Sequence, residues 1–228
     1  MKKRVSAILL IAGSSTRYQK GYNKNFEIMN NHPLFYYSLK VMDNHPNIQE
    51  ILLVIKKEEE QEVKEFLQKE SFQKKIILVY GGSTRKESVF HALQEANENI
   101  VCIHDGARPF IQKEYINQCI EYMDSYRGVI VGVPVKDTIK IVNEQKEIET
   151  STNREFTYIG QTPQCFDKEL LRRLHERYQD DSTITDDSIL LEREKIKVKV
   201  IPGSYHNIKL TTKEDYYYVK ELLEKGDA

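Results

Sequence analysis

The fold is decided by residues 5–13, which read Val5-Ser6-Ala7-Ile8-Leu9-Leu10-Ile11-Ala12-Gly13. The run is apolar almost throughout and ends at a glycine, which is typical of a strand buried on both faces that leads into a loop. Similar runs recur along the chain and alternate with stretches of helical spacing. The expected strands are residues 5–12, 51–56, 75–80, 100–104 and 128–135, and the expected helices are 33–43, 58–70, 86–97 and 113–126. This alternation predicts an α/β fold with a mostly parallel sheet covered by helices.

The pattern changes after residue 135. Residues 137–143 and 146–152 are expected to form two polar strands around a charged turn, too short and hydrophilic for another crossover. We expect a single domain, residues 1–228, from which residues 136–160 leave as a β-arm. Because such an arm is marginal alone, it is expected to pack against a second copy of the protein; a hairpin folded back on its own domain is the alternative. Further helices are expected at 167–178, 186–193 and 212–224, and a strand at 197–201.

Composition excludes several classes of protein. Among 228 residues, 39% are apolar and 30% charged, so the chain has material for a sizeable core. The net charge of −1 provides no field for general nucleic-acid binding, and no apolar run predicts a membrane span. Cys102, Cys119 and Cys165 lack C-x-x-C spacing, which argues against a disulfide framework or a zinc site and favours a cytoplasmic location.

Candidate ligand-binding residues follow the expected strands, because open parallel sheets bind ligands beyond the carboxyl ends of their strands. After the first strand come small, hydroxyl and basic residues: Ala12, Gly13, Ser14, Ser15, Arg17 and Lys24. They outline a polyphosphate-binding loop, although a solvated basic loop has the same composition. Gly82, Ser83 and Ser88 follow the third strand and would let the backbone approach a flat ligand; an ordinary glycine-rich turn is the alternative.

The fourth expected strand ends in His104 and is followed by Asp105, Gly106 and Arg108. An aspartate here can bind a sugar hydroxyl or help to hold a metal–phosphate complex, and a buried Asp–Arg pair is the alternative. Residues 206–211 are expected to end another strand and to bring Lys209 to the same edge. Thr185 lies at the start of an expected helix, where an N-cap is the simpler interpretation.

Together these positions predict that Arg17, Lys24, Arg108 and Lys209 meet at one edge of the sheet. Transfer at a phosphate needs such an arrangement, because two anions must be held together while charge spreads at phosphorus. The chain has no nucleophile–base triad and no H-E-x-x-H motif. It also lacks both the P-loop and the G-x-G-x-x-G fingerprint, which argues against an NAD dehydrogenase.

As a set, these segments resemble the IspD family, the 2-C-methyl-D-erythritol 4-phosphate cytidylyltransferases. The similarity covers about residues 5–222 and rests on residues 12–17 with Lys24, Gly81 and Gly82 with Arg85 and Ser88, 104–109, 134–140, 161–164 with Phe166, 185–187 and 207–211. The resemblance implies a Rossmann-like, three-layer nucleotidyltransferase that uses CTP and magnesium. It implies a CDP-linked methylerythritol and pyrophosphate as products, and a homodimer formed through the arm.

The resemblance also implies roles for individual residues. Arg17, Lys24 and Lys209 would be catalytic and would steady the phosphates. The nucleotide would be held by Ala12, Gly13, Ser14, Ser15, Gly82, Ser83, Ser88 and Asp105. The sugar phosphate would be bound by Asp105, Arg108, Thr138, Thr162, Thr185 and Lys209, with Arg154 reaching across from the partner's arm. No metal ligand from the protein is expected, because magnesium would lie mainly on the phosphates of CTP.

Four positions depart from the family pattern. Ile11 stands where the family has Ala, Ser15 where it has Gly, Asn23 where it has Pro and Gly106 where it has Ala. Ser15 is expected to weaken nucleotide binding because it restricts the backbone, whereas Asn23 and Gly106 are expected to loosen the loop.

The alternative functions are a ribitol-5-phosphate cytidylyltransferase, which shares the arm, and a non-catalytic nucleotide-binding regulator. Base preference for CTP over UTP is left open.

Overall fold

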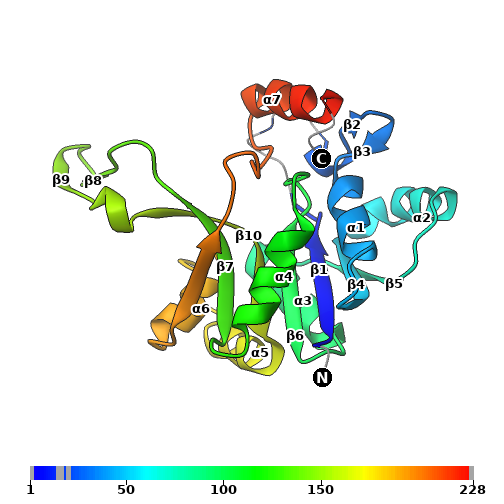
Figure 1. Ribbon diagram of the computed structural model, residues 1–228, viewed down its shortest axis with the longest axis horizontal. Helices are drawn as coiled ribbons and strands as arrows, with labels where there is room; N and C mark the ends of the chain where they lie inside the picture. Colours follow the sequence, from blue (N-terminus) through cyan, green and yellow to red (C-terminus); the bar gives the residue numbers. More distant parts are fainter. Residues whose placement is uncertain (1–2, 14–17, 19–21, 226–228) are drawn as a thin grey trace.

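A seven-stranded sheet forms the centre of the molecule in the computed structural model, which describes residues 3–13, 18 and 22–225 (Figure 1). In spatial order, its strands are β11 (Val198–Pro202), β7 (Gly128–Pro134), β10 (Tyr158–Asp167), β6 (Ile100–Asp105), β1 (Val5–Leu10), β4 (Ile48–Ile55) and β5 (Lys75–Tyr80). Neighbours are parallel except at β10, which runs antiparallel to both β6 and β7. The predicted α/β fold with a mostly parallel sheet is confirmed.

Helices cover both faces of the sheet. One face carries α1 (Phe35–Asp43), α2 (Glu60–Lys69) and α4 (Lys113–Tyr122), and the other carries α3 (Arg85–Glu95), α5 (Lys168–Arg177) and α6 (Ser188–Arg193). Successive side chains of a strand point to opposite faces. Ala7 and Leu9 of β1 therefore belong to the first core, and Ile8 belongs to the second. The result is three layers, α/β/α.

A third apolar cluster lies at the carboxyl edge of the sheet. The last helix, α7 (Lys213–Glu224), contributes Leu222 and Leu223, which cluster with Leu34 and Phe110. A small hairpin of β2 (Ile28–Met29) and β3 (His32–Pro33) lies on the same side (Figure 1). These elements border the edge at which the candidate residues lie. Within the described ranges, no helix combines the length and apolar character needed to cross a membrane.

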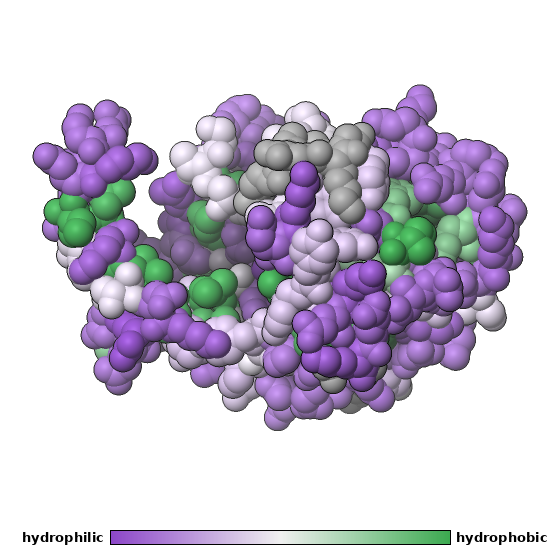
Figure 2. All heavy atoms as spheres, turned by 90° about the horizontal axis from the view of Figure 1, so that it is seen from above, coloured by the Kyte–Doolittle hydropathy of each residue, from purple (hydrophilic) through white to green (hydrophobic). Residues whose placement is uncertain are grey.

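The arm projects from the main body (Figure 1). Its strands β8 (Lys140–Val142) and β9 (Ile148–Ser151) pair antiparallel and are shorter than expected. The 3-10 helix η4 (Arg154–Phe156) follows, and the chain enters β10 at Tyr158, where it pairs with β7. Apolar side chains on the arm are exposed, including Phe156 at 76%. Figure 2 shows these apolar atoms set apart from the main body.

Strand β10 is not among the strands expected from the sequence. Its residues Gln161, Thr162 and Gln164 are polar yet buried, so they lack the apolar pattern of a central strand. Pro163 has no N–H to donate, and the register with β7 shifts between Gln161 and Gln164. The expectation that a strand ends at residues 206–211 is also wrong, because β11 ends at Pro202 and residues 203–211 are irregular.

Candidate active site

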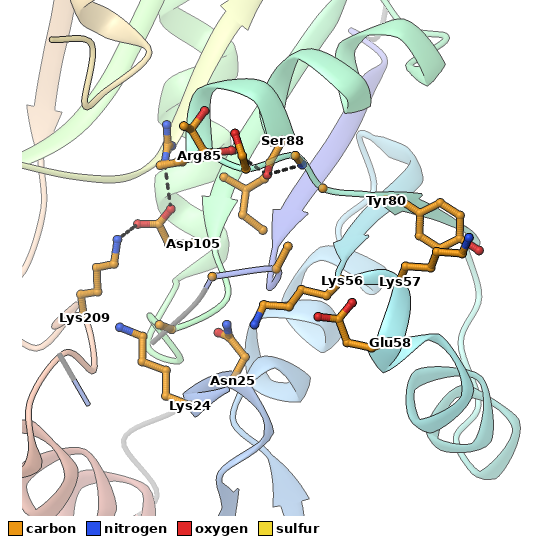
Figure 3. Close-up of a pocket in the computed structure, with 18 residues that line it drawn as sticks. Lys24, Asn25, Lys56, Lys57, Glu58, Tyr80, Arg85, Ser88, Asp105 and Lys209 are labelled. Carbon is orange, nitrogen blue, oxygen red and sulfur yellow. Dashed lines mark hydrogen bonds and ion pairs between the residues drawn. The ribbon is translucent and has the colours of Figure 1, made fainter. Parts of the chain in front are cut away.

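A pocket of about 560 Å³ opens at the carboxyl ends of β1, β4, β5 and β6 (Figure 3). This is the edge at which ligands bind in open parallel sheets. The pocket is lined by eight of the predicted site residues: Ala12, Gly13, Lys24, Gly82, Ser83, Ser88, Asp105 and Lys209. Segments far apart in the sequence therefore meet around one cavity.

The loop after β5 brings the backbone close to β1. A Cβ atom on Gly81 would lie 2.8 Å from the Cβ of Ala12 and 2.9 Å from Ser88 Oγ, so only glycine allows this approach. Ser88 Oγ accepts a hydrogen bond from the N–H of Gly82 at 3.0 Å and donates one to the carbonyl of Thr84 at 2.8 Å. These contacts fix the glycine loop as one wall of the pocket.

Asp105, the last residue of β6, joins two cations from distant segments. Lys209 Nζ donates to its Oδ2 at 2.6 Å, and Arg85 Nε donates to its Oδ1 at 3.3 Å (Figure 3). Burial alone would raise the pKa of Asp105, but the positive charges of Lys209, Arg85 and Arg108 outweigh it and hold the pKa well below its usual range. The carboxylate is therefore ionised and holds both cations at the pocket wall.

A second carboxylate positions Arg85 from behind. Arg85 Nη1 donates to Asp187 Oδ2 at 2.6 Å, and His175 Nε2 lies 3.1 Å from Asp187 Oδ1. Burial lowers the pKa of Arg85, yet the carboxylates of Asp187 and Asp105 more than compensate and raise it above its ordinary value. Arg85 is thus fully charged and held between two acids, one of which lines the pocket.

The segment that carries Lys209 is fixed by hydrogen bonds to β10 and to the loop that follows β6. Asn207 is fully buried, and its Nδ2 donates to the carbonyl of Thr162 at 2.9 Å. Arg108 Nη1 donates to the carbonyl of Asn207 at 2.7 Å. The N–H of Leu210 donates to the carbonyl of Ala107 at 2.8 Å. Although residues 206–211 form no strand, they still bring Lys209 to the predicted edge.

Behind Asp105, Thr162 and His104 form a buried chain of hydrogen bonds. The N–H of Asp105 donates to Thr162 Oγ1 at 3.2 Å, and that hydroxyl donates to His104 Nδ1 at 2.9 Å. His104 Nε2 donates to the carbonyl of Arg108 at 3.0 Å. Burial lowers the pKa of His104 to about 4, against the opposing effect of the Arg108 carbonyl. A neutral imidazole with its proton on Nε2 satisfies every bond in this chain.

Lys24 enters the pocket on the 3-10 helix η2 (Lys24–Phe26). Its neighbour Asn23 caps this helix and accepts a bond from the N–H of Asn25 at 3.1 Å. Asn23 Nδ2 also donates to the carbonyl of Ile11 at 2.6 Å. The expectation that Asn23 loosens the loop is therefore wrong, because its side chain ties the loop to the end of β1.

Gly106 is also tightly packed. A Cβ atom at this position would lie 2.5 Å from Ile11 Cγ2 and 3.1 Å from the carbonyl of Leu10. The branched side chain of Ile11 fills the space that an alanine at 106 would need, and its Cγ2 cannot swing away freely. The departures at 11 and 106 are thus a matched pair, and Gly106 does not loosen this site.

The remaining predicted residues lie elsewhere. Arg108 is half-buried beside Asp105 but bonds Asn207, and Thr162 is buried behind the pocket wall. Thr185 is exposed before α6, and Thr138 and Arg154 are exposed on the arm. None of these five is among the residues that line the described pocket. Ser14, Ser15 and Arg17 lie outside the described residues.

Ten of the residues that line the described pocket are not among the predicted site residues, and the polar ones include Arg85, Asn25 and Lys56. Arg85 belongs to the segment that carries the resemblance, and its place directly after a glycine turn could have marked it. Lys56 follows the end of β4 and could have been found by the rule applied to the other strands. Asn25 has no comparable sequence pattern.

Comparison with known proteins identifies the family of the chain. The sequence model of the family described as IspD, 2-C-methyl-D-erythritol 4-phosphate cytidylyltransferase, matches residues 5–225. The chain belongs to this family. Its curated members include a protein of Caldanaerobacter subterraneus subsp. tengcongensis, 40% identical over 97% of this chain and 99% of that protein. Another, from Alkaliphilus metalliredigens, is 41% identical over 97% and 94% of the two chains. Both are named 2-C-methyl-D-erythritol 4-phosphate cytidylyltransferase.

A solved structure of the family shares the fold over nearly the whole chain. The 4-diphosphocytidyl-2C-methyl-D-erythritol synthase of Anaerococcus prevotii superimposes with a TM-score of 0.87 at 34% identity. The match covers 98% of this chain and all of the other. The Rossmann-like, three-layer architecture of the IspD family is therefore the architecture of this chain.

Proposed function

We propose that this chain transfers the cytidylyl group of CTP to the phosphate of 2-C-methyl-D-erythritol 4-phosphate and releases pyrophosphate. The observation that carries the proposal is the meeting of Asp105, Lys209, Arg85 and Lys24 around one pocket in a member of this family. The names of the relatives favour methylerythritol phosphate over ribitol phosphate as acceptor. No observation favours a non-catalytic regulator.

In the proposed reaction, a phosphate oxygen of the acceptor attacks the α-phosphorus of CTP. The bond from the α-phosphorus to the bridging oxygen breaks, and its electron pair leaves with pyrophosphate, so no covalent enzyme intermediate is needed. Lys24 and Lys209 would neutralise the charge that spreads over the phosphoryl oxygens. Arg17, Ser14 and Ser15 keep their predicted roles at the phosphates, and the glycine loop with Ala12 and Gly13 would hold the nucleotide.

Magnesium is proposed to enter with the nucleotide. The described residues contain no group of three His, Cys, Asp or Glu side chains able to cage a metal ion. The carboxylates that line the described pocket are those of Glu58 and Asp105, and Asp105 is already bonded to Lys209 and Arg85. Phosphate oxygens would therefore be the chief ligands, as magnesium prefers. The ion would supply charge neutralisation at the phosphates.

A homodimer through the arm is proposed to complete the acceptor site. Ile141, Ile148 and Phe156 expose apolar surface on the arm, which a second arm could cover. Thr138 and Arg154 lie on this arm, away from the pocket of their own chain, as residues that serve a partner's site would. We expect Phe156→Asp to shift the protein from dimer to monomer in sedimentation equilibrium. A monomer before substitution would contradict the proposal.

The free thiols of Cys102, Cys119 and Cys165, all buried, support a cytoplasmic site of action, because such thiols persist in a reducing compartment. The substrates would be CTP and the polyol phosphate, with no nucleic acid and no membrane as partner.

The function is tested by crossing CTP and UTP with methylerythritol 4-phosphate and ribitol 5-phosphate while pyrophosphate release is measured with magnesium. The expected result is release with CTP and methylerythritol phosphate, and its loss in Lys24→Ala. Preference for ribitol 5-phosphate would show that this polyol phosphate, and not methylerythritol 4-phosphate, is the acceptor. No release with any pair would refute the proposed transfer.

A further inference from the structure

Two carboxamides converge on a single backbone oxygen beside Lys24. Asn23 Nδ2 and Asn25 Nδ2 donate to the carbonyl of Ile11 at 2.6 and 3.0 Å. Ile11 is the first residue after β1, and it is fully buried. The residues on both sides of Lys24 are thus bonded to the same point at the carboxyl end of β1.

The two carboxamides are also bonded to each other and to a third segment. Asn25 Nδ2 donates to Asn23 Oδ1 at 2.9 Å. Asn23 Nδ2 also donates to Glu59 Oε1 at 2.9 Å, and Glu59 Oε2 accepts the N–H of Lys56 at 3.2 Å. This second contact anchors Asn23 to η3 (Lys57–Glu59), which follows β4. Asn23 and Asn25 are 7% and 3% exposed, so water competes little for these bonds.

We propose that Asn23 and Asn25 are positioning residues that set the place of the Lys24 ammonium in the pocket. They form a clamp, defined here as Asn23, Asn25, the Ile11 carbonyl and Glu59. The side chains of Lys24 and Asn25, both on η2, line the cavity side by side (Figure 3), and Lys24 is the one of the two that carries a charge. The inference rests on the proposed function, since Lys24 acts on a phosphoryl group that must be met within a fraction of an ångström.

A double-mutant cycle tests the clamp, because residues that act only through Lys24 lose their effect once Lys24 is gone. We expect Asn23→Ala to lower kcat about tenfold or more through misplacement of Lys24, with a smaller change in KM for CTP. In the Lys24→Ala background, the same substitution should change kcat by less than about twofold. Asn25→Ala should behave in the same way.

Asn47, which precedes β4, offers a control near the other end of β1. Its Nδ2 donates to the carbonyl of Lys3 at 2.9 Å, so Asn47→Ala removes a similar bond far from the pocket. We expect both substitutions to lower the denaturation midpoint, Asn23→Ala by more because its side chain makes more bonds, while only Asn23→Ala lowers kcat. Equal losses of kcat in Asn47→Ala and Asn23→Ala would overturn the clamp. So would a loss of kcat from Asn23→Ala that is as large in the Lys24→Ala protein as in the unaltered protein.

The same variants separate this inference from the proposed function. The dissociation constant for magnesium-bound CTP is measured by calorimetry in the unaltered protein, both single variants and the double variant. If the unaltered protein binds CTP but releases no pyrophosphate, the proposed function fails. The clamp is still supported in that case if the two single substitutions change the free energy of CTP binding non-additively in the double variant. The clamp would be overturned if the changes in CTP-binding free energy caused by the two single substitutions added up in the double variant. It would also be overturned if the unaltered protein did not bind CTP.

Discussion

The pocket and the arm differ in how their side chains are partnered. At the pocket, Asp105 is 8% exposed and both of its oxygens are bonded to cations of the same chain. On the arm, Ile148 and Phe156 are 64% and 76% exposed. The pocket is thus organised within one chain before any substrate arrives, whereas the arm leaves apolar side chains exposed.

Under the proposed function, this difference separates two groups of site residues. Those at the pocket are held by networks, in which removal of one member leaves a buried charge without its partner. Those on the arm contribute little to their own fold, so their substitution should change association and leave the folded chain intact. The following substitutions test whether the two regions differ in this way.

The largest effect is expected from Lys209→Ala. It removes one of the proposed catalytic cations and leaves Asp105 with Arg85 as its bonded partner. We expect kcat for pyrophosphate release to fall about 10²- to 10³-fold, the usual loss of one group that stabilises a developing charge. Lys213→Ala, an exposed position at the start of α7, is the control. Similar kcat values in the two variants would show that Lys209 does not act on the reaction.

Gly106→Ala tests the packing beneath the pocket. The added methyl group meets Ile11 Cγ2, so we expect the free energy of unfolding to fall by about 1–3 kcal/mol in urea denaturation. In an Ile11→Ala background the same change should cost less, because the closest of its contacts is gone. Gly160→Ala, whose Cβ would have only Ile130 within 4 Å, is the control. Equal losses of unfolding free energy in Gly106→Ala and Gly160→Ala would contradict the matched packing of Ile11 and Gly106.

His104 should make stability depend on pH. The folded chain keeps the imidazole neutral down to its pKa of about 4, whereas the unfolded chain protonates near pH 6.5. Acid therefore favours the unfolded chain between these values. This group should remove about 2 kcal/mol of stability from pH 7 to pH 5. Urea denaturation of His104→Gln should show a loss smaller by that amount, and an unchanged pH dependence would refute a buried neutral His104.

The smallest effect is expected on the arm. Ile148→Ser should change the free energy of unfolding of the dissociated chain by less than about 0.5 kcal/mol, because the side chain packs little against its own domain. Ile8→Ser, in the buried core, is the contrast and should lower it by several times that value. A loss at Ile148 that approaches the loss at Ile8 would favour the hairpin that folds back on its own domain.

The sequence predicted those elements whose burial follows a simple apolar period. Residues 5–12 are apolar on both faces and were assigned to a strand, and β1 occupies Val5–Leu10. Strand β10 has the same central position but carries Gln161, Thr162 and Gln164. Their burial depends on partners such as His104 and Asp186, which lie elsewhere in the chain. No local pattern could show it.

The same limit applies to the site. Converging strand ends predict Asp105 and Lys209 at one edge, and their contact is 2.6 Å. The strand expected before Lys209 does not form, so hydrogen bonds of residues 207 and 210 bring it there instead. The role of Asn23 could not be predicted, because its importance comes from the carbonyl of Ile11 and the carboxylate of Glu59. Tertiary contacts, not residue type, decide whether such a side chain loosens or fixes a loop.

The most direct test of the account is a crystal structure of the protein with magnesium and CTP. It should show the triphosphate between the Gly81–Gly82 loop and Lys24, with the α-phosphate within hydrogen-bond distance of Lys209. A nucleotide bound elsewhere, with Lys24 and Lys209 making no contact to phosphate, would contradict the assignment of this pocket as the site of transfer.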